Sequence, residues 1–98
     1  VRPEDRAVIQ AHASYLQRNP GATISLEGHA DERGTREYNS ALGERRAKAV
    51  RNLMSLQGGS ARQIRTVSWG EEQPIDRGHD EAAWAQNRRV EIIYLTRQ

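Results

Sequence analysis

The sequence predicts a small α/β domain built on a partly parallel sheet, and three observations lead to that fold class. From residue 37 to residue 56 an apolar stripe recurs at helical spacing, which predicts a long helix; its members are Tyr38, Leu42, Ala49, Val50, Leu53 and Leu56. Residues 23–28 alternate between apolar and polar side chains, as in a half-buried strand. The predicted elements follow one another as helix, strand, helix, strand, short helix and strand. Helices that alternate with strands imply right-handed crossovers between parallel strands.

The first half of the chain carries start and stop signals for its elements. Pro3 stands where a first helical turn begins, and Asn19-Pro20-Gly21 ends that helix. After the strand at 23–28, a loop runs through Arg36 to the long helix, which Gly58-Gly59 stops.

The second half contains two further strands and a short helix. Ile64 to Trp69 form the second strand, and residues 70–78 form a turn-rich connection. Asp80 can then cap a short helix that runs through Asn87. Residues 90–95 form the last strand, and they are apolar enough for an internal position in the sheet.

Composition narrows the classes of function. The 98 residues are 29% charged and 36% hydrophobic, which is typical of one small globular domain. No apolar run approaches the ~18 residues that span a bilayer. Cysteine is absent, which excludes disulfide and thiolate chemistry. The net charge is only +2, with acids and bases interspersed, so a nucleic-acid partner is not favoured.

An acid ends the first strand, and a base lies on the inner face of the helix that follows. At about 100° per residue, Arg46 falls inside the apolar stripe, between Leu42, Val50 and Leu53. A guanidinium does not shed its proton, so Arg46 needs an acidic partner or an anionic ligand. Asp31 is the nearest candidate by topology. The two residues form either a structural ion pair or a ligand site. The second alternative is considered because α/β folds bind ligands where strands end.

Metal and catalytic sites are less favoured. His29 and Asp31 share a strand face, and His79 and Asp80 recur later, but the spacing fixes no third ligand. We expect His29 to be hydrogen-bonded at the rim of the site and His79 to be a loop residue. The serines lack a nucleophile-elbow context, and an arginine beside Asp31 would depress the pKa of its carboxyl. That shift suits binding, and a hydrolase is kept as an alternative.

Other polar and aromatic residues have structural interpretations. His12 lies on the apolar side of the first helix, as a core histidine with a hydrogen-bond partner would. Trp69 on its strand indicates core. Trp84 is either a cover for the core or a contact for a protein partner, since tryptophan is enriched at interfaces. The basic helix face of Arg45, Lys48, Arg51 and Asn52 is a solvated surface or a docking face for an acidic partner.

Long stretches of the chain resemble the OmpA-like peptidoglycan-binding domain. The matching segments are Gly-His-Ala-Asp-Glu-Arg-Gly-Thr at 28–35, Tyr38-Asn39, Leu42-Gly43-Glu44-Arg45-Arg46-Ala47, Ser68-Trp69-Gly70, Pro74 and Asn87-Arg88-Arg89-Val90. Within that family, the sequence at 29–35 and the Gly-His-Asp-Glu-Ala-Ala stretch at 78–83 are most similar to the peptidoglycan-associated lipoproteins. The resemblance extends from Arg2 to Leu95.

The resemblance implies a fold and a set of partners. The fold would be a two-layer α+β sandwich with the order β-α-β-α-β-β, a mixed sheet, and helices on one face. The last strand would lie between the first and the second. The function would be non-catalytic binding of the peptidoglycan stem peptide through meso-diaminopimelate, without a cofactor. Such lipoproteins are anchored at the periplasmic face of the Gram-negative outer membrane and bind TolB in the Tol–Pal system. A TolB-binding domain without wall binding is the alternative of a different class.

The resemblance also assigns site residues and marks a difference at the start of the chain. Family members hold the ligand through the aspartate and arginine that match Asp31 and Arg46. The supporting positions match Arg33, Thr35, Asn39, Leu42 and Arg88. We expect residues 1–98 to be one domain that lacks the family's first strand, linker and lipidation cysteine. Without that strand, residues 90–95 would form an apolar edge, which predicts self-association.

Overall fold

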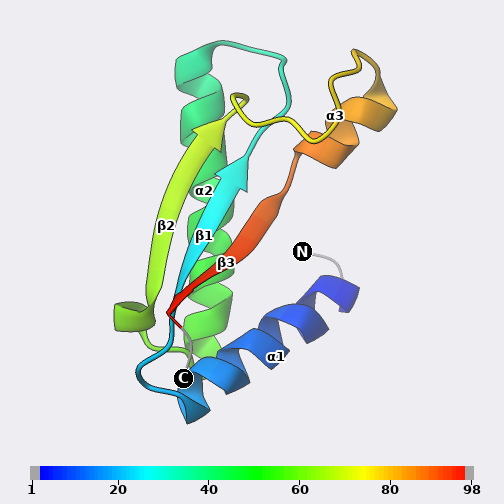
Figure 1. Cartoon of the computed structure of the whole chain (residues 1–98). Coiled ribbons are helices and arrows are strands. Elements are labelled where there is room, and N and C mark those ends of the chain that lie inside the picture. The colour runs from blue at the N-terminus through cyan, green and yellow to red at the C-terminus, as the bar shows by residue number, and fades with distance from the viewer. Residues whose placement is uncertain (1–2, 97–98) are drawn as a thin grey trace.

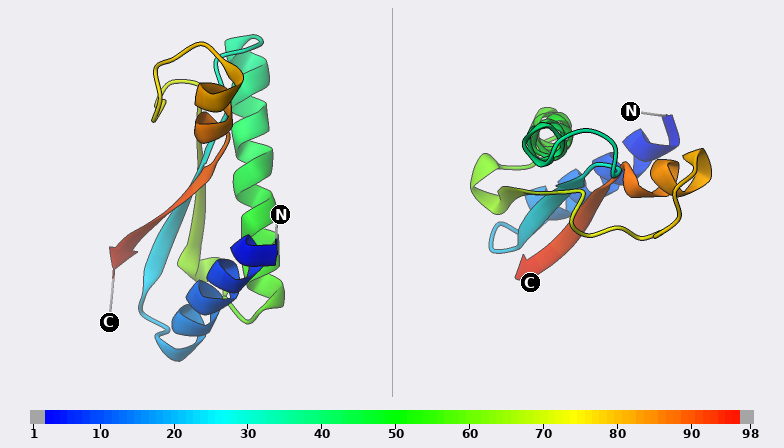
Figure 2. Two further views of the ribbon diagram at one scale, coloured as in Figure 1. Left: turned by 90° about the vertical axis from the view of Figure 1, so that its right-hand side faces the viewer. Right: turned by 90° about the horizontal axis from the view of Figure 1, so that it is seen from above.

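A three-stranded sheet with two long helices on one of its faces forms the body of the protein (Figures 1 and 2). The computed structural model describes residues 3–96. Its elements are α1 (Pro3–Arg18), β1 (Thr23–His29), α2 (Arg36–Leu56), a 3-10 turn η1 (Ala61–Gln63), β2 (Ile64–Gly70), α3 (Glu81–Asn87) and β3 (Val90–Thr96). No helix within that range is long and apolar enough to cross a membrane.

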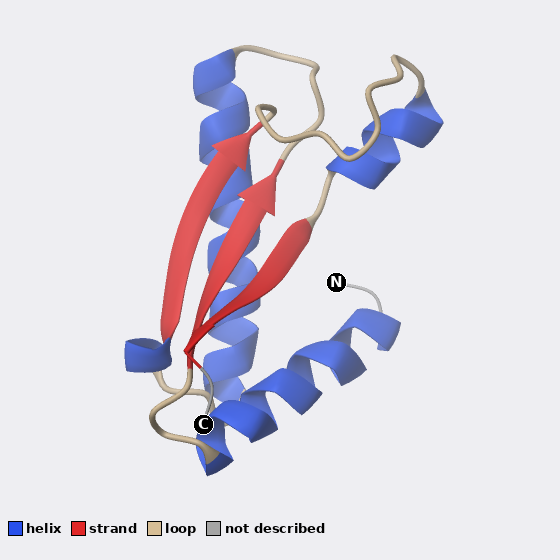
Figure 3. Cartoon of the chain, viewed as in Figure 1, coloured by secondary structure: helices blue, strands red, loops and turns tan. Residues whose placement is uncertain are grey.

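The sheet has the order β2-β1-β3, with β1 parallel to β2 and antiparallel to β3. This arrangement confirms the predicted partly parallel sheet and the pairing of the last strand with the strand at 23–29. Ile24 lies opposite Ile64 and Tyr94, so apolar side chains form a row across all three strands. Figure 3 shows that the loops after β1 and β2 lie at the same end of the sheet, close to α3.

The core lies between this sheet face and the two long helices. Its buried members are Ile9, Ala13, Leu16, Ala22, Ile24, Leu26, Ala47, Met54 and Ile64. The predicted stripe on α2 was displaced around the helix, since Tyr38 and Leu56 are 56% and 83% exposed. Asn39 and Gly43 are buried in their place. The reason is that the first half of α2 packs directly on strand backbone at Gly28, which leaves room there for small or hydrogen-bonded side chains, whereas Met54 is buried near the end of the helix.

Trp69 is not a core residue, contrary to the sequence-based interpretation. It alternates with Ser68 along β2 and lies half-buried on the sheet face away from the helices. Its indole Nε1 donates a 2.8 Å hydrogen bond to Glu27 Oε1 on β1. His12, by contrast, has the expected partner, because its Nδ1 lies 2.8 Å from the Tyr94 hydroxyl.

The strand β3 lies at an edge of the sheet that residues 3–96 form, not in its interior. Ile93 and Leu95 on this strand are 39% and 49% exposed. An apolar edge invites pairing with another chain. Self-association of the 98-residue chain stays a prediction, and we expect sedimentation velocity to show a dimer that Ile93→Lys weakens. A monomer at high concentration would contradict it.

The closest approach between the layers joins α2 to β1 through two glycines. A Cβ on Gly28 would collide with the carbonyl oxygen of Gly43, and a Cβ on Gly43 would lie 2.8 Å from the Gly28 oxygen. This contact brings α2 against the end of β1, where the predicted site residues are.

We expect Gly28→Ala to lower the free energy of unfolding by at least about 2 kcal/mol, because α2 must move away from the strand. Urea denaturation measures the change. Ala41→Ser on the exposed side of α2 is the control and should cost less than about 0.5 kcal/mol. Equal stability of Gly28→Ala and the parent chain would contradict the close packing.

Candidate functional site

A pocket of about 320 Å³ opens at the carboxyl end of β1, beside the first turns of α2. It is lined by Asp31, Arg33, Gly34, Tyr38, Asn39, Leu42, Arg46 and Arg88. The structure therefore brings together six of the seven residues that the sequence predicted for the site. Thr35 is the exception, since its side chain caps α2 by accepting a 3.1 Å hydrogen bond from the Tyr38 backbone N–H.

The sequence did not assign Gly34 and Tyr38 to the pocket. Gly34 has φ +92°, a left-handed conformation that favours glycine and turns the loop toward the helix. Tyr38 was placed on the apolar stripe of the helix. Tyr38 and Leu42 are four residues apart and therefore share one face of the helix, and this spacing was the signal that could have assigned Tyr38 to the pocket.

Asp31 is buried and fully occupied by two arginines. Its Oδ1 accepts hydrogen bonds from the backbone N–H of Arg33 at 3.0 Å and from the Arg33 Nε at 3.1 Å. Its Oδ2 accepts from Arg33 Nη2 at 2.8 Å and from Arg88 Nη1 at 3.1 Å. The hydrogen bonds from the Arg33 side chain, foremost, hold the pKa of this carboxyl well below its usual range.

The predicted partner of Asp31 was wrong. Within residues 3–96, Arg46 forms no hydrogen bond or ion pair with Asp31, and Arg33 takes that place two residues along the chain. The loop that follows β1 turns back on itself, so the nearest base by topology was in the loop and not on the helix.

Arg46 is half-buried, and within residues 3–96 its one hydrogen bond goes to a backbone carbonyl. Its Nη1 donates a 2.8 Å hydrogen bond to the His29 oxygen at the end of β1. Burial, first, and the neighbouring positive charge of Arg88 lower the pKa of this guanidinium. Arg33 and Arg88 have carboxylate partners, whereas in the described part of the chain Arg46 has none. Arg46 is therefore the arginine of this pocket whose charge no carboxylate balances.

Two further residues connect the pocket to its surroundings. Asn39 is buried, and its Nδ2 donates a 2.9 Å hydrogen bond to Glu71 Oε1 on the connection after β2. Arg88 reaches Glu81 at the start of α3, with 2.6 Å between Nη2 and Oε1. The pocket thus depends on contacts with the segment after β2 and with the start of α3.

A cluster beside the pocket joins the loop after β1 to α3. Glu32 accepts hydrogen bonds from Trp84 Nε1 at 2.8 Å and pairs with His79 Nδ1 at 2.7 Å. This pairing raises the pKa of His79. The Arg33 guanidinium lies 4.4 Å from the centre of the Trp84 ring. Trp84 therefore packs against the loop of the site. From the sequence, it was expected either to cover the core or to contact a protein partner.

The two histidine–aspartate pairs do not assemble. Among the described residues there is no group of three acids or histidines that could hold a metal ion. His29 was expected to be hydrogen-bonded at the rim, but it is buried and neither ring nitrogen has a hydrogen-bond partner there. Its Nε2 lies 3.5 Å from Glu91 Oε2, and burial lowers the pKa of the imidazole.

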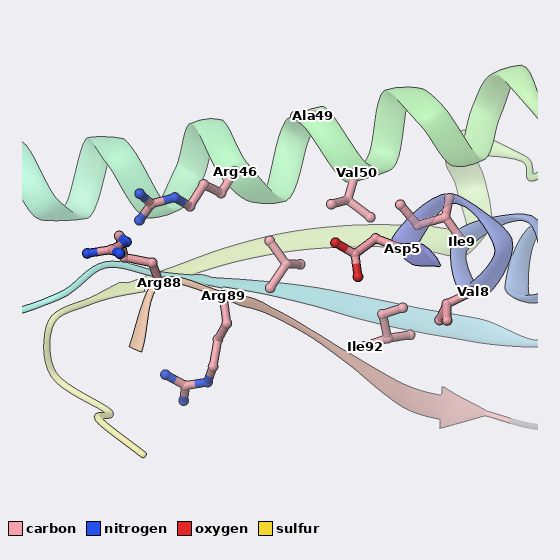
Figure 4. A pocket seen from close by; sticks show the side chains of 10 residues that line it. Asp5, Val8, Ile9, Arg46, Ala49, Val50, Arg88, Arg89 and Ile92 are labelled. Carbon is pink, nitrogen blue, oxygen red and sulfur yellow. The ribbon is translucent and has the colours of Figure 1, made fainter. Parts of the chain in front are cut away.

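A larger hollow of about 560 Å³ lies between α1, α2 and β3 (Figure 4). Its wall is mostly apolar and includes Val8, Ile9, Val50 and Ile92. Arg46 and Arg88 line this hollow as well as the smaller pocket, so they stand between the two. Asp5 and Arg89 also line the larger hollow, whereas Asp31 and Arg33 line the smaller pocket.

A family comparison places this architecture. The sequence model of the OmpA family matches residues 1–88. The chain belongs to the OmpA family.

Curated relatives of this OmpA domain include peptidoglycan-associated lipoproteins. The peptidoglycan-associated lipoprotein of Legionella pneumophila is 57% identical over 86 residues, which are 88% of this chain and 49% of that protein. The lipoprotein of the same name from Pseudomonas aeruginosa is 55% identical over 92 residues, 94% of this chain and 54% of that protein. This OmpA domain therefore spans about half the length of the curated relatives it matches.

Solved structures confirm the fold of the family. The crystal structure of the peptidoglycan-associated lipoprotein from Burkholderia pseudomallei has a TM-score of 0.93 and 50% identity, over 96% of this chain and 80% of that chain. The C-terminal domain of Helicobacter pylori MotB has a TM-score of 0.86 at 24% identity, over 98% and 75%, and shares the fold. The predicted OmpA-like mixed sheet, with helices on one face, is confirmed.

The low pKa of Asp31 predicts an acid-sensitive site. A carboxyl whose pKa is depressed by folding stabilises the fold above its unfolded pKa near 4, and this contribution falls as the pH drops further. We expect Asp31→Asn to lower the free energy of unfolding by about 1–3 kcal/mol at pH 7. The difference from the parent chain should narrow at pH 3. Urea titrations at both pH values measure it, and a constant difference would contradict the assignment.

Proposed function

We propose that this OmpA domain binds the peptidoglycan stem peptide through the side chain of meso-diaminopimelate, without catalysis. The observation that carries the proposal is a buried carboxylate and an arginine without a carboxylate partner in one pocket. Diaminopimelate ends in an ammonium and a carboxylate on the same carbon, so it presents the opposite charge to each. The family and the name of its relatives support this choice of ligand.

Three charged groups of the pocket have roles in this complex. Asp31 accepts hydrogen bonds from the ligand ammonium. Arg46 holds the ligand carboxylate in a fork, a geometry that guanidinium groups favour. Arg88 adds positive charge beside Arg46 and keeps Asp31 ionised.

The other residues shape the pocket rather than carry its charge. Leu42 lies against the aliphatic part of the ligand, and Asn39 positions the wall on the side of α2. Thr35 acts at one remove, by capping the helix that carries Asn39, Leu42 and Arg46.

The whole protein would be a wall anchor of the cell envelope. We propose that residues 1–98 are the peptidoglycan-binding domain of a longer lipoprotein, held by lipid at the periplasmic face of the outer membrane. Its relatives are named for that association with the wall and for their lipid. A TolB-like partner within a Tol–Pal-like system belongs to the same proposal, and so does a role in envelope integrity and cell division.

Arg46→Ala should reduce affinity for a diaminopimelate stem tripeptide by more than about 30-fold, because the ligand carboxylate loses its fork. Stability should change by less than about 1 kcal/mol, because one hydrogen bond to a carbonyl is lost and an unpaired, half-buried charge is removed. Isothermal titration and urea denaturation measure the two effects. Arg45→Ala on the exposed face of α2 is the matched control and should alter neither. Equal binding by the two variants would contradict the role of Arg46.

Replacing diaminopimelate by lysine should weaken binding by about 1.5–3 kcal/mol, the usual worth of a hydrogen bond to a charged group. Lysine keeps the ammonium for Asp31 but lacks the carboxylate for Arg46. Titration of the two tripeptides against the same protein measures the difference, and a diaminopimelate peptide amidated at that carboxylate is the third arm. Equal affinity for all three would mean that the charges of this pocket are purely structural. No heat with any of them, together with binding to TolB, would favour the protein-interaction alternative.

A further inference from the structure

The ammonium position that the proposed function requires is already filled by the protein. A carboxylate offers about four acceptor positions. At Asp31 all four are used, three by Arg33 and one by Arg88. A ligand ammonium can reach Asp31 only if one of these donors leaves.

Arg33 is the donor that can leave. Its side chain is 51% exposed, whereas that of Arg88 is 29% exposed. Arg88 is also tied to Glu81 by its other terminal nitrogen. Half-exposed ion pairs are weak, because solvent competes for both partners.

Arg33 also has a second stabilising contact, with the Trp84 ring. Its guanidinium already lies 4.4 Å from the centre of the Trp84 ring, and that ring is fixed by the hydrogen bond from its Nε1 to Glu32. A cation over an aromatic face is stabilised without any contribution from Asp31. The side chain can therefore give up the carboxylate and keep the ring.

The net charge of the pocket also favours exchange of Arg33 for the ligand ammonium. One carboxylate and three guanidinium groups line it, so an incoming ammonium meets a net positive wall. If the ammonium replaces the guanidinium of Arg33 at Asp31, the number of cations on that carboxylate is unchanged.

We propose that Arg33 is a resident competitor for the ligand: its guanidinium occupies the ammonium position on Asp31, and when a diaminopimelate side chain binds it leaves that carboxylate and stays over the Trp84 ring. This inference rests on the proposed function, and it assigns to Arg33 a role opposite to the supporting one that the family resemblance implied. Arg33 then sets the affinity and the selectivity of the site, because only a ligand that also engages Arg46 compensates for displacing it.

Removing the competitor should strengthen binding. We expect Arg33→Ala and Arg33→Gln to bind the diaminopimelate stem tripeptide about three- to tenfold more tightly than the parent chain, the range that a half-exposed ion pair supplies. Isothermal titration measures the affinities. Arg36→Ala is the matched control. This substitution removes the same charge three residues away, but Arg36 pairs with Glu72 and does not line the pocket. It should bind as the parent chain does.

A second measurement follows Arg33 itself. In ¹⁵N-labelled parent protein, the Arg33 Nε–H signal should shift on saturation with the tripeptide as its hydrogen bond to Asp31 is broken, and the Trp84 Nε1–H signal should shift with it. This measurement uses the parent protein alone. It therefore tests the displacement even if an Arg33 variant does not fold.

The outcomes separate the two proposals. Weaker or equal binding by both Arg33 variants, or an equal gain in Arg36→Ala, overturns the displacement and leaves the proposed function standing. An unchanged Arg33 Nε–H signal at saturation does the same. If neither the parent chain nor the variants bind the tripeptide, the proposed function is wrong and the displacement with it. Binding that appears only in the Arg33 variants supports the displacement in its strongest form.

Discussion

The contact between α2 and β1 at Gly28 and Gly43 is the constraint on which the rest of the structure depends. Because neither residue has a side chain, the helix lies directly on strand backbone. Three residues farther along α2, Arg46 can therefore reach the carbonyl of His29 where β1 ends. One turn before Gly43, Asn39 is buried and faces the connection after β2. The pocket is thus formed by packing between layers, and its polar groups are added at the end of that contact.

The charges of the site are balanced by partners from three segments. Asp31 is held by its own loop and by Arg88 from the segment that follows α3. Glu81 and Glu32 then engage the outer sides of Arg88 and of the Trp84 ring, so acidic groups surround the basic pocket. Arg46 is outside this balance. Within residues 3–96, Arg46 is the one arginine lining this pocket that has no carboxylate partner, and from this observation we propose that the pocket receives an anion.

The sequence predicted the elements well because their signals are local. Pro3, the Asn19-Pro20-Gly21 turn and Gly58-Gly59 act on their own backbone, and the structure places helix ends close to each of them. Hydrophobic periodicity was less accurate for α2. It assumes that bulky apolar side chains face the core, whereas the first half of this helix buries Asn39, Gly43 and Ala47.

Spacing and topology indicated Asp31 and Arg46 as site residues, and the family resemblance supplied the others, but neither predicted how the charges pair. In the structure, residues from 31–46 and Arg88 line one pocket. The pairing of Asp31 with Arg33 depends on the conformation of a loop, which Gly34 and the distant Trp84 determine together. No periodic pattern contains that information. Likewise, a helical wheel places Arg46 on the inner face but does not distinguish a buried charge from a half-buried one.

In the proposed complex, one pocket holds both ends of a zwitterion. A structure of this protein with the diaminopimelate stem tripeptide, by crystallography or by intermolecular NOEs, is the decisive measurement. We expect the ligand ammonium within hydrogen-bond distance of the Asp31 carboxylate and the ligand carboxylate within hydrogen-bond distance of the Arg46 guanidinium. A ligand seated in the hollow between α1, α2 and β3, with Asp31 and Arg46 both free of it, would show that the proposed complex is wrong.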